Sequence, residues 1–198
     1  MKRTEVGDEM KRMMMIGIAL IFIVVGCQAE KIEPNTEARP VKDFEFTSEK
    51  GKTIAKDDLK GDWWVAYFMY THCTTVCPQT TAHLVNMQET LQEDDIHPRI
   101  VSFSVDPDYD NEKRLKAYAK EYDADTAHWD FLTGYDFKTI KQFSIESFKA
   151  MLSEGAADQR AHSYYFYLIN PDGEMVKKYD GLSVDEVDVL TEDLKKVM

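Results

Sequence analysis

The chain has 198 residues, of which 30% are charged and 43% hydrophobic, and its formal net charge is −12 at pH 7. A chain this acidic is repelled by nucleic acid and by anionic lipid headgroups, so binding to either through charge is excluded. Its length allows one domain with a sizeable core after an N-terminal leader.

Residues 1–26 have the pattern of a targeting signal. A short basic leader precedes an uncharged apolar run at positions 13–26, which is too short for an ordinary membrane span. The run ends in a glycine directly before Cys27, and this junction resembles the lipobox of bacterial lipoproteins, in which the cysteine becomes a lipidated N-terminus. We expect a cleaved signal peptide and a lipid anchor on Cys27, with an uncleaved N-terminal anchor as the alternative.

Either form of attachment places the rest of the chain at the outer face of a bacterial cytoplasmic membrane. Residues 27–40 are polar, contain two prolines and show no periodicity, so they are predicted to be a tether. From Cys27 onward the chain carries 20 basic and 33 acidic residues, a net charge of −13. We therefore expect the lipid, not surface charge, to hold residues 41–198 near the membrane.

The domain at 41–198 begins with a predicted β-hairpin, whose strands at 44–46 and 52–54 flank a Glu-Lys-Gly-Lys segment. The aromatic and β-branched run at 63–70 predicts a strand buried on both faces. Pro78 suits the first turn of a helix. Apolar residues then recur at helical spacing, at Leu84, Met87 and Leu91.

The remaining sequence alternates strand and helix patterns. Further strands are predicted at 99–105, 129–132, 163–170 and 175–179, and helices at 112–122, at 136–148 with a break near Ser144, and after a capping box that Ser183 opens. Such alternation predicts an α/β fold with a central mixed sheet flanked by helices. A cysteine pair at the first strand-to-helix junction makes this fold thioredoxin-like.

Cys73 and Cys77 form that pair. The N-terminus of a helix favours negative charge, which lowers a thiol pKa toward the thiolate. A spacing of four on a helical turn separates the Cα atoms by about 6 Å, which allows either a disulfide or two ligands on one metal ion. In an oxidising compartment we expect a redox-active pair, the alternatives being a static disulfide or two buried apolar cysteines. With Cys27 assigned to lipid, no cysteine is left for another bridge.

Several motifs together resemble the Sco/SenC family, and they extend in the family's order from about Val41 to the C-terminus. The motifs are Tyr70-Thr71-His72-Cys73-Thr74-Thr75-Val76-Cys77-Pro78, Ser104-Val105-Asp106-Pro107-Asp108-Tyr109-Asp110, Leu132-Thr133-Gly134, His162-Ser163, Tyr167-Leu168-Ile169 and Pro171-Asp172-Gly173. The resemblance implies a thioredoxin fold, one copper ion, and a role in assembling the CuA centre of cytochrome c oxidase subunit II. By position, the implied copper ligands are Cys73, Cys77 and His162. Many relatives have Pro-Asp where this chain has Thr74-Thr75.

His162 directly precedes the predicted strand at 163–170, where thioredoxin-like reductases carry a proline that packs against the cysteine pair. An imidazole in that position would face the sulfurs. Thiolates select Cu(I) and an added imidazole allows Cu(II), although zinc accepts the same ligands. A core or surface histidine is the simpler alternative. The other histidines are expected to be solvated or packed, with His72 tuning the neighbouring thiolate.

Asp106 and Asp110 follow the second buried strand, at the same edge of the sheet as the cysteines. They either orient the metal ligands or hold a proton, or Asp106 caps the following turn.

Two functions fit these residues. The first is a copper metallochaperone for oxidase subunit II. The second is a membrane-anchored thiol–disulfide oxidoreductase that acts on the same target or on other exported proteins, with a thiol reductant protein as partner. A peroxiredoxin-like peroxidase is a weaker third interpretation.

The lipobox yields a direct prediction. Cys27→Ala should leave the precursor uncleaved, because the lipoprotein peptidase acts only ahead of a lipidated cysteine. Mass spectrometry of the membrane and soluble fractions measures this outcome. Normal processing and membrane retention of the variant would contradict the prediction.

Overall fold

The computed structural model describes residues 32–154 and 160–198. The predicted signal peptide and Cys27 lie outside the described residues. Within the described part, no helix combines the length and hydropathy needed to cross a membrane.

Helices and strands alternate along most of the chain. The strands are β1 (Arg39–Pro40), β2 (Glu45–Ser48), β3 (Thr53–Ala55), β4 (Trp64–Met69), β5 (Arg99–Ser104), β6 (Trp129–Thr133), β7 (Ser153–Glu154), β8 (Arg160–Ala161), β9 (Tyr165–Ile169) and β10 (Glu174–Asp180). The helices are the 3-10 helix η2 (Lys56–Leu59) and the α-helices α2 (Cys77–Gln92), α3 (Glu112–Glu121), α4 (Phe137–Phe148) and α5 (Val184–Val197).

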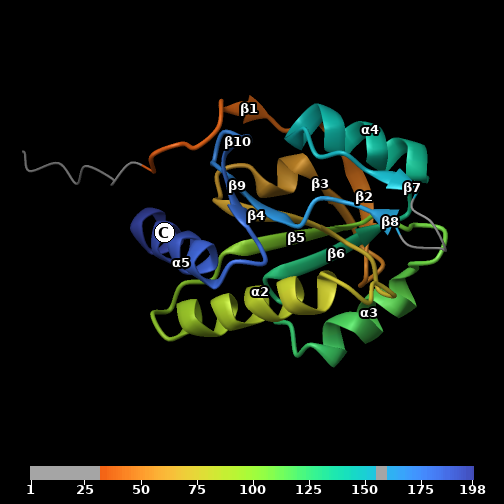
Figure 1. Cartoon of the computed structure of the whole chain (residues 1–198), viewed down its shortest axis with the longest axis horizontal. Coiled ribbons are helices and arrows are strands. Elements are labelled where there is room, and N and C mark those ends of the chain that lie inside the picture. The colour runs from red at the N-terminus through yellow and green to blue at the C-terminus, as the bar shows by residue number, and fades with distance from the viewer. Residues whose placement is uncertain (1–31, 155–159) are drawn as a thin grey trace, which may run out of the picture. The chain divides into compact units, whose positions relative to one another are not determined.

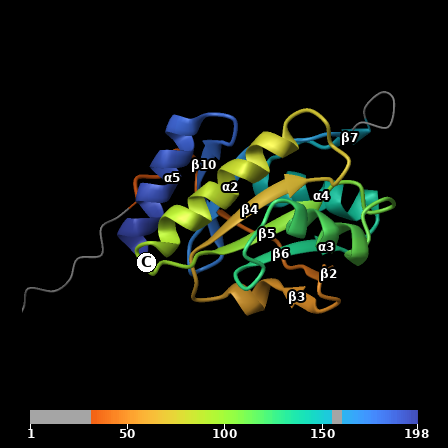
Figure 2. The same cartoon turned by 90° about the horizontal axis from the view of Figure 1, so that it is seen from below.

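Eight strands form one mixed sheet in the order β1-β10-β9-β4-β5-β6-β2-β3. The central strands β4, β5 and β6 are parallel, whereas β9 runs antiparallel to β4 and β10 antiparallel to β9. β2 and β3 form the predicted hairpin. Figure 1 shows α2 and α3 on one face of the sheet and α4 on the other, and Figure 2 shows α5 beside α2, against which it packs. The predicted thioredoxin-like α/β fold, a mixed sheet flanked by helices, is confirmed.

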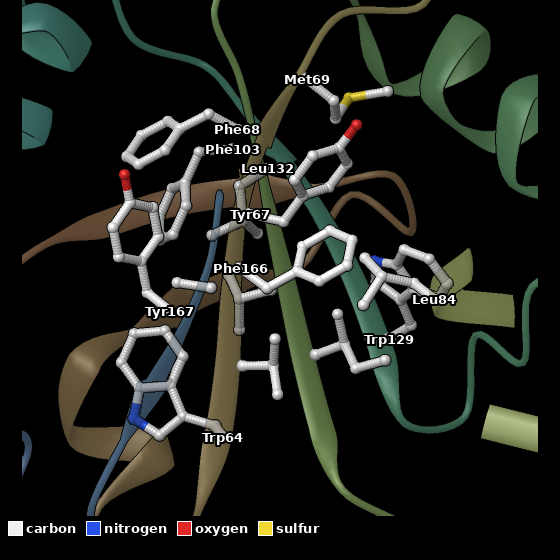
Figure 3. Close-up of a cluster of buried hydrophobic side chains, with 14 of the residues drawn as sticks. Trp64, Tyr67, Phe68, Met69, Leu84, Phe103, Trp129, Leu132, Phe166 and Tyr167 are labelled. Carbon is white, nitrogen blue, oxygen red and sulfur yellow. The ribbon is translucent and has the colours of Figure 1, made fainter. Parts of the chain in front are cut away.

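The core lies on both faces of β4, all six residues of which are buried. Its side chains alternate between the two faces, as a strand requires. Figure 3 shows Phe68 beside Phe103 on one side and Tyr67 beside Phe166 on the other; the ring centroids are 5.5 and 5.4 Å apart. Leu84 of α2 is fully buried in this core. The cysteine loop therefore starts from a strand that is buried along its whole length.

The sequence predicted a break near Ser144 in the helix at 136–148. This prediction is wrong, because α4 continues through Ser144. The buried Ser144 hydroxyl lies 2.9 Å from the carbonyl oxygens of Lys141 and Ala150, so the helix and the chain after it satisfy the polar group.

The segment expected to be a tether also differs. Asn35 exchanges two hydrogen bonds with the backbone of Lys178, and Arg39–Pro40 pair with β10. Residues 35–40 therefore lie along the sheet.

Packing of α2 on the sheet should dominate the stability of the cysteine-bearing element. Leu84→Ala should lower the free energy of unfolding by about 2 to 5 kcal/mol, because it removes a buried side chain and leaves a cavity. Denaturant unfolding measures the change. Val189→Ala on α5 is the control, since Val189 is 44% exposed and its truncation should change stability by less than about 0.5 kcal/mol. Equal losses in the two variants would contradict this assignment of the core.

Candidate metal centre

Three chain segments meet at one edge of the sheet. The loop after β4 carries Cys73, and α2 begins at Cys77. Because β9 runs antiparallel to β4, the start of β9 lies beside the end of β4. His162 lies just before β9 and directly after β8, which pairs with β7 in a two-stranded ribbon. The topology thus brings His162 to the cysteines across 85 residues of sequence.

The side chains of Cys73, Cys77 and His162 each offer one ligand atom, and these atoms lie within 4.8 Å of one another. Cys77 Sγ is 3.4 Å from His162 Nε2. His162 Nδ1 lies 2.8 Å from the carbonyl oxygen of Ser163; a carbonyl only accepts, so Nδ1 carries the proton. Nε2 is therefore left with its lone pair directed to the sulfur side, as metal binding requires.

Neither cysteine is in a disulfide, and the two sulfurs differ in burial and in protonation. The hydrogen bond from Cys77 is the main cause that lowers the pKa of Cys73 to about 2; burial opposes this shift and the contact with His162 adds to it. Burial, followed by the hydrogen bond to Cys73 and the charge on Cys73, raises the pKa of Cys77. The pair therefore holds one proton at neutral pH, with a thiolate at Cys73 and a thiol at Cys77.

The position of Cys73 differs from the expected one. It lies in the loop before α2 and not on the first turn of the helix. Its Sγ accepts the backbone N–H of Cys77 at 3.5 Å, so the helix N-terminus still contributes to the low pKa, although less than the neighbouring thiol does. The loop includes Thr75, whose hydroxyl lies 3.6 Å from Cys73 Sγ. Thr75 thus gives the sulfur another polar neighbour.

Asp106 contacts both segments that carry the proposed ligands. Its carboxylate lies 3.4 Å from His72 Nε2 and 3.2 Å from Arg160 Nη2. His72 precedes Cys73 directly, and Arg160 precedes His162 by two residues. Of the two interpretations drawn from sequence, this geometry favours a carboxylate that orients the site.

Asp110 is fully buried and fixes the start of the cysteine loop. Its carboxylate accepts hydrogen bonds from the backbone N–H and hydroxyl of Thr71, at 3.1 and 2.5 Å, and from the hydroxyl of Ser104 at 2.6 Å. Burial raises the pKa of Asp110, and these hydrogen bonds oppose the rise. Asp110 thus affects the position of the sulfurs by holding the backbone at the start of the cysteine loop.

Two residues at the site were not assigned a role from sequence. Burial, and next the hydrogen bond with Cys73, raises the pKa of Tyr70, so its phenol stays protonated beside the sulfur. The Tyr70 ring also packs edge-on against His162, at a centroid distance of 5.5 Å. Arg160 is the second, through its ion pair with Asp106. Tyr70 belongs to the apolar run of the predicted strand, so the sequence indicated only a core position for it. No local sequence pattern points to Arg160.

The histidines outside the cluster contact other parts of the chain. His72 faces Asp106, and His83 Nδ1 lies 2.8 Å from the carbonyl oxygen of Gly181. His97 and His128 lie near each other, away from the cysteines.

Two sulfurs and an imidazole within one cluster suit a soft or borderline metal ion such as copper or zinc. Two thiols this close can also exchange with a disulfide.

The SCO1/SenC family model matches residues 32–198. The SCO1 protein homolog of Bacillus subtilis is 39% identical over 181 residues, which cover 90% of this chain and 92% of that protein. A SCO1/SenC family lipoprotein from Bacillus anthracis has a solved structure with a TM-score of 0.78 and 37% identity, covering 81% of this chain and 97% of that one.

Two further structures are informative. BsSco, described as a member of the Sco family of cytochrome c oxidase assembly proteins with a disulfide switch, has a TM-score of 0.77 at 37% identity and covers 84% of this chain and 98% of that one. Arabidopsis thaliana ScoI was solved with copper bound and has a TM-score of 0.68 at 26% identity, covering 79% of this chain and 96% of that one. The match of the family model over the whole described domain, with relatives at this identity, shows that the chain belongs to the SCO1/SenC family.

Proposed function

We propose that this protein is a copper metallochaperone that binds one copper ion through Cys73, Cys77 and His162. The clustering of these three donors carries the proposal. Thiolates favour Cu(I), and the imidazole extends the site to Cu(II). Copper in the structure of Arabidopsis thaliana ScoI supports the choice of metal.

The proposed recipient is the CuA domain of cytochrome c oxidase subunit II, consistent with the description of BsSco as an oxidase assembly protein. A groove of about 730 Å³ opens beside His162 and could receive it. The chain has a net charge of −12, but the charged residues that line the groove are one acidic side chain, Glu37, and three cationic ones, Arg39, Lys149 and Lys178. Met151, which is 82% exposed, adds apolar surface. Apolar surface and charge of this kind suit a transient protein partner.

We also propose that the lipid on Cys27 holds the domain at the outer face of the membrane. The likeness to the Bacillus anthracis SCO1/SenC family lipoprotein supports this placement.

A second function uses the same sulfurs. The thiolate of Cys73 and the adjacent thiol of Cys77 are the pair that thiol–disulfide exchange needs, and BsSco has a disulfide switch. The protein would then reduce cysteines of the oxidase subunit or of other exported proteins, with a thiol reductant protein restoring the pair. Copper binding and disulfide formation exclude each other, because both use the same two sulfurs.

The protonation of the pair predicts the pH dependence of copper binding. Cys73 is already a thiolate at neutral pH, whereas Cys77 must lose its proton to bind metal, so copper uptake should release about one proton. Because the pKa of Cys77 is raised, protons compete with copper throughout the neutral range. The affinity should therefore rise about tenfold per pH unit between pH 6 and 8. Calorimetry in buffers of different ionisation enthalpy measures the protons released, and a release near two would show that both thiols are protonated.

His162 separates the two functions, because a three-ligand copper site needs the imidazole and thiol exchange needs only the sulfurs. His162→Ala should weaken copper binding by about 3 to 5 kcal/mol, the share of one ligand in a site worth about 10 to 16 kcal/mol. The Cys73–Cys77 pair should still cycle with an exogenous thiol. His83→Ala is the matched control, since it removes an imidazole outside the site.

Oxidase assembly in cells carrying His162→Ala decides between the functions, scored by the copper content of the CuA subunit. Lost assembly with intact thiol exchange supports the metallochaperone. Full assembly by a variant that binds no copper would assign the function to thiol chemistry.

A further inference from the structure

A second group of metal-binding side chains lies at the opposite edge of the sheet. The parallel strands β5 and β6 both begin there. His97 precedes β5 by two residues and His128 directly precedes β6, and the backbone N–H of Ile100 donates to the carbonyl oxygen of His128 at 2.8 Å. The pairing of the two strands therefore fixes the two histidines side by side, although 31 positions separate them in the sequence.

Asp125 completes the group. The side chains of His97, Asp125 and His128 each offer one ligand atom, and these atoms lie within 4.8 Å of one another. The two imidazole rings are 4.7 Å apart and nearly parallel, and His128 Nδ1 is 2.9 Å from an Asp125 carboxylate oxygen. The side chains are 36%, 30% and 36% exposed, so the group lies at the surface and is in contact with solvent.

Neighbouring groups hold the Asp125 carboxylate in place. One oxygen accepts the backbone N–H of Ala127 at 2.9 Å, and the other accepts the amide of Gln92 at 3.1 Å. Burial opposes ionisation, but the hydrogen bonds from His128 and Ala127 outweigh it and lower the pKa of Asp125. The backbone N–H of Asp125 donates to Gln88 Oε1 at 3.2 Å. Two glutamines of α2 thus position a charged ligand, as groups around metal sites do.

His97 supplies an independent observation. Its Nδ1 is buried and has no hydrogen-bond partner among residues 32–154 and 160–198. Buried polar atoms in folded proteins nearly always have a partner, and a missing one points to an ion or a water molecule. The other ring nitrogen, Nε2, lies 3.4 Å from Asp95 Oδ1, and an ion held by this group would give Nδ1 the partner that it lacks.

We propose that His97, Asp125 and His128 form a second site, which binds a divalent cation of the zinc and copper(II) class. Two imidazoles are borderline ligands that suit these ions, zinc also accepts a carboxylate oxygen, and such a set binds Cu²⁺ more tightly than Zn²⁺. The six residues of β5 separate the edges of the sheet, so the site lies about 20 Å from the cysteines. It joins the C-terminal end of α2 to the loops before β5 and β6, and a bound ion should stabilise these connections.

The test uses the full chain in detergent with the cysteine site removed, as Cys27→Ser, Cys73→Ser, Cys77→Ser and His162→Ala combined. This variant should bind one equivalent of Cu²⁺ with an electron paramagnetic resonance spectrum that shows coupling to imidazole nitrogen. Zn²⁺ should compete for the site and raise the midpoint of thermal unfolding. Because the proposed copper ligands are absent, the outcome does not depend on the proposed function.

Single substitutions in that background identify the ligands. His97→Ala and His128→Ala should each lower the affinity for Cu²⁺ at least tenfold, and Gln92→Ala should lower it by roughly tenfold by releasing Asp125. His83→Ala is the matched control and should leave the affinity unchanged. Circular dichroism checks that each variant is folded, and His97→Gln replaces His97→Ala if that variant is not. Absence of Cu²⁺ binding, or binding that survives the loss of either histidine, would overturn the proposal.

Discussion

The candidate metal centre depends on one buried carboxylate. Asp110 is inaccessible to solvent, and an ionised carboxylate in such a place is costly unless donors surround it. The two donors of Thr71 and the hydroxyl of Ser104 provide that compensation, while the Thr133 hydroxyl donates to the Asp110 carbonyl oxygen at 2.7 Å. These bonds connect the ends of β4, β5 and β6. The three parallel strands at the centre of the sheet therefore hold the cysteine loop in position.

A loop fixed in this way decides how the two sulfurs share a proton. Cys77 is packed at the start of α2 with no exposed surface, so its thiol is kept neutral by burial. Cys73 receives hydrogen bonds from the Cys77 thiol, from the backbone N–H of Cys77 and from Tyr70, which directly follows β4, and these bonds stabilise its thiolate. The asymmetry arises from the deeper burial of Cys77 and from the hydrogen bonds that Cys73 receives, and not from residue type, since both are cysteines.

Sequence was sufficient where the physical cause is local. Two-sided burial of β4, the helical spacing of α2 and the Ser183 cap of α5 each follow from residues within one element, and the structure contains all three. Sequence was insufficient where the physical cause lies far away along the chain. Arg160 reaches the site through β8, a strand of two residues with no periodicity. The pairing of His97 with His128 likewise requires the register of β5 on β6.

The burial of the three proposed ligands also sets an order of access. Cys73 is 8% exposed and carries the thiolate, whereas Cys77 is fully buried behind it with His162 at 3.4 Å. A copper ion or a partner disulfide therefore meets a sulfur that is already deprotonated, and Cys77 takes part only afterwards, once its proton leaves. His162 Nε2 lies on the same side as Cys77 Sγ, with its lone pair directed to the sulfurs. One arrangement thus serves both proposed chemistries in the first step, and only metal binding then uses the imidazole.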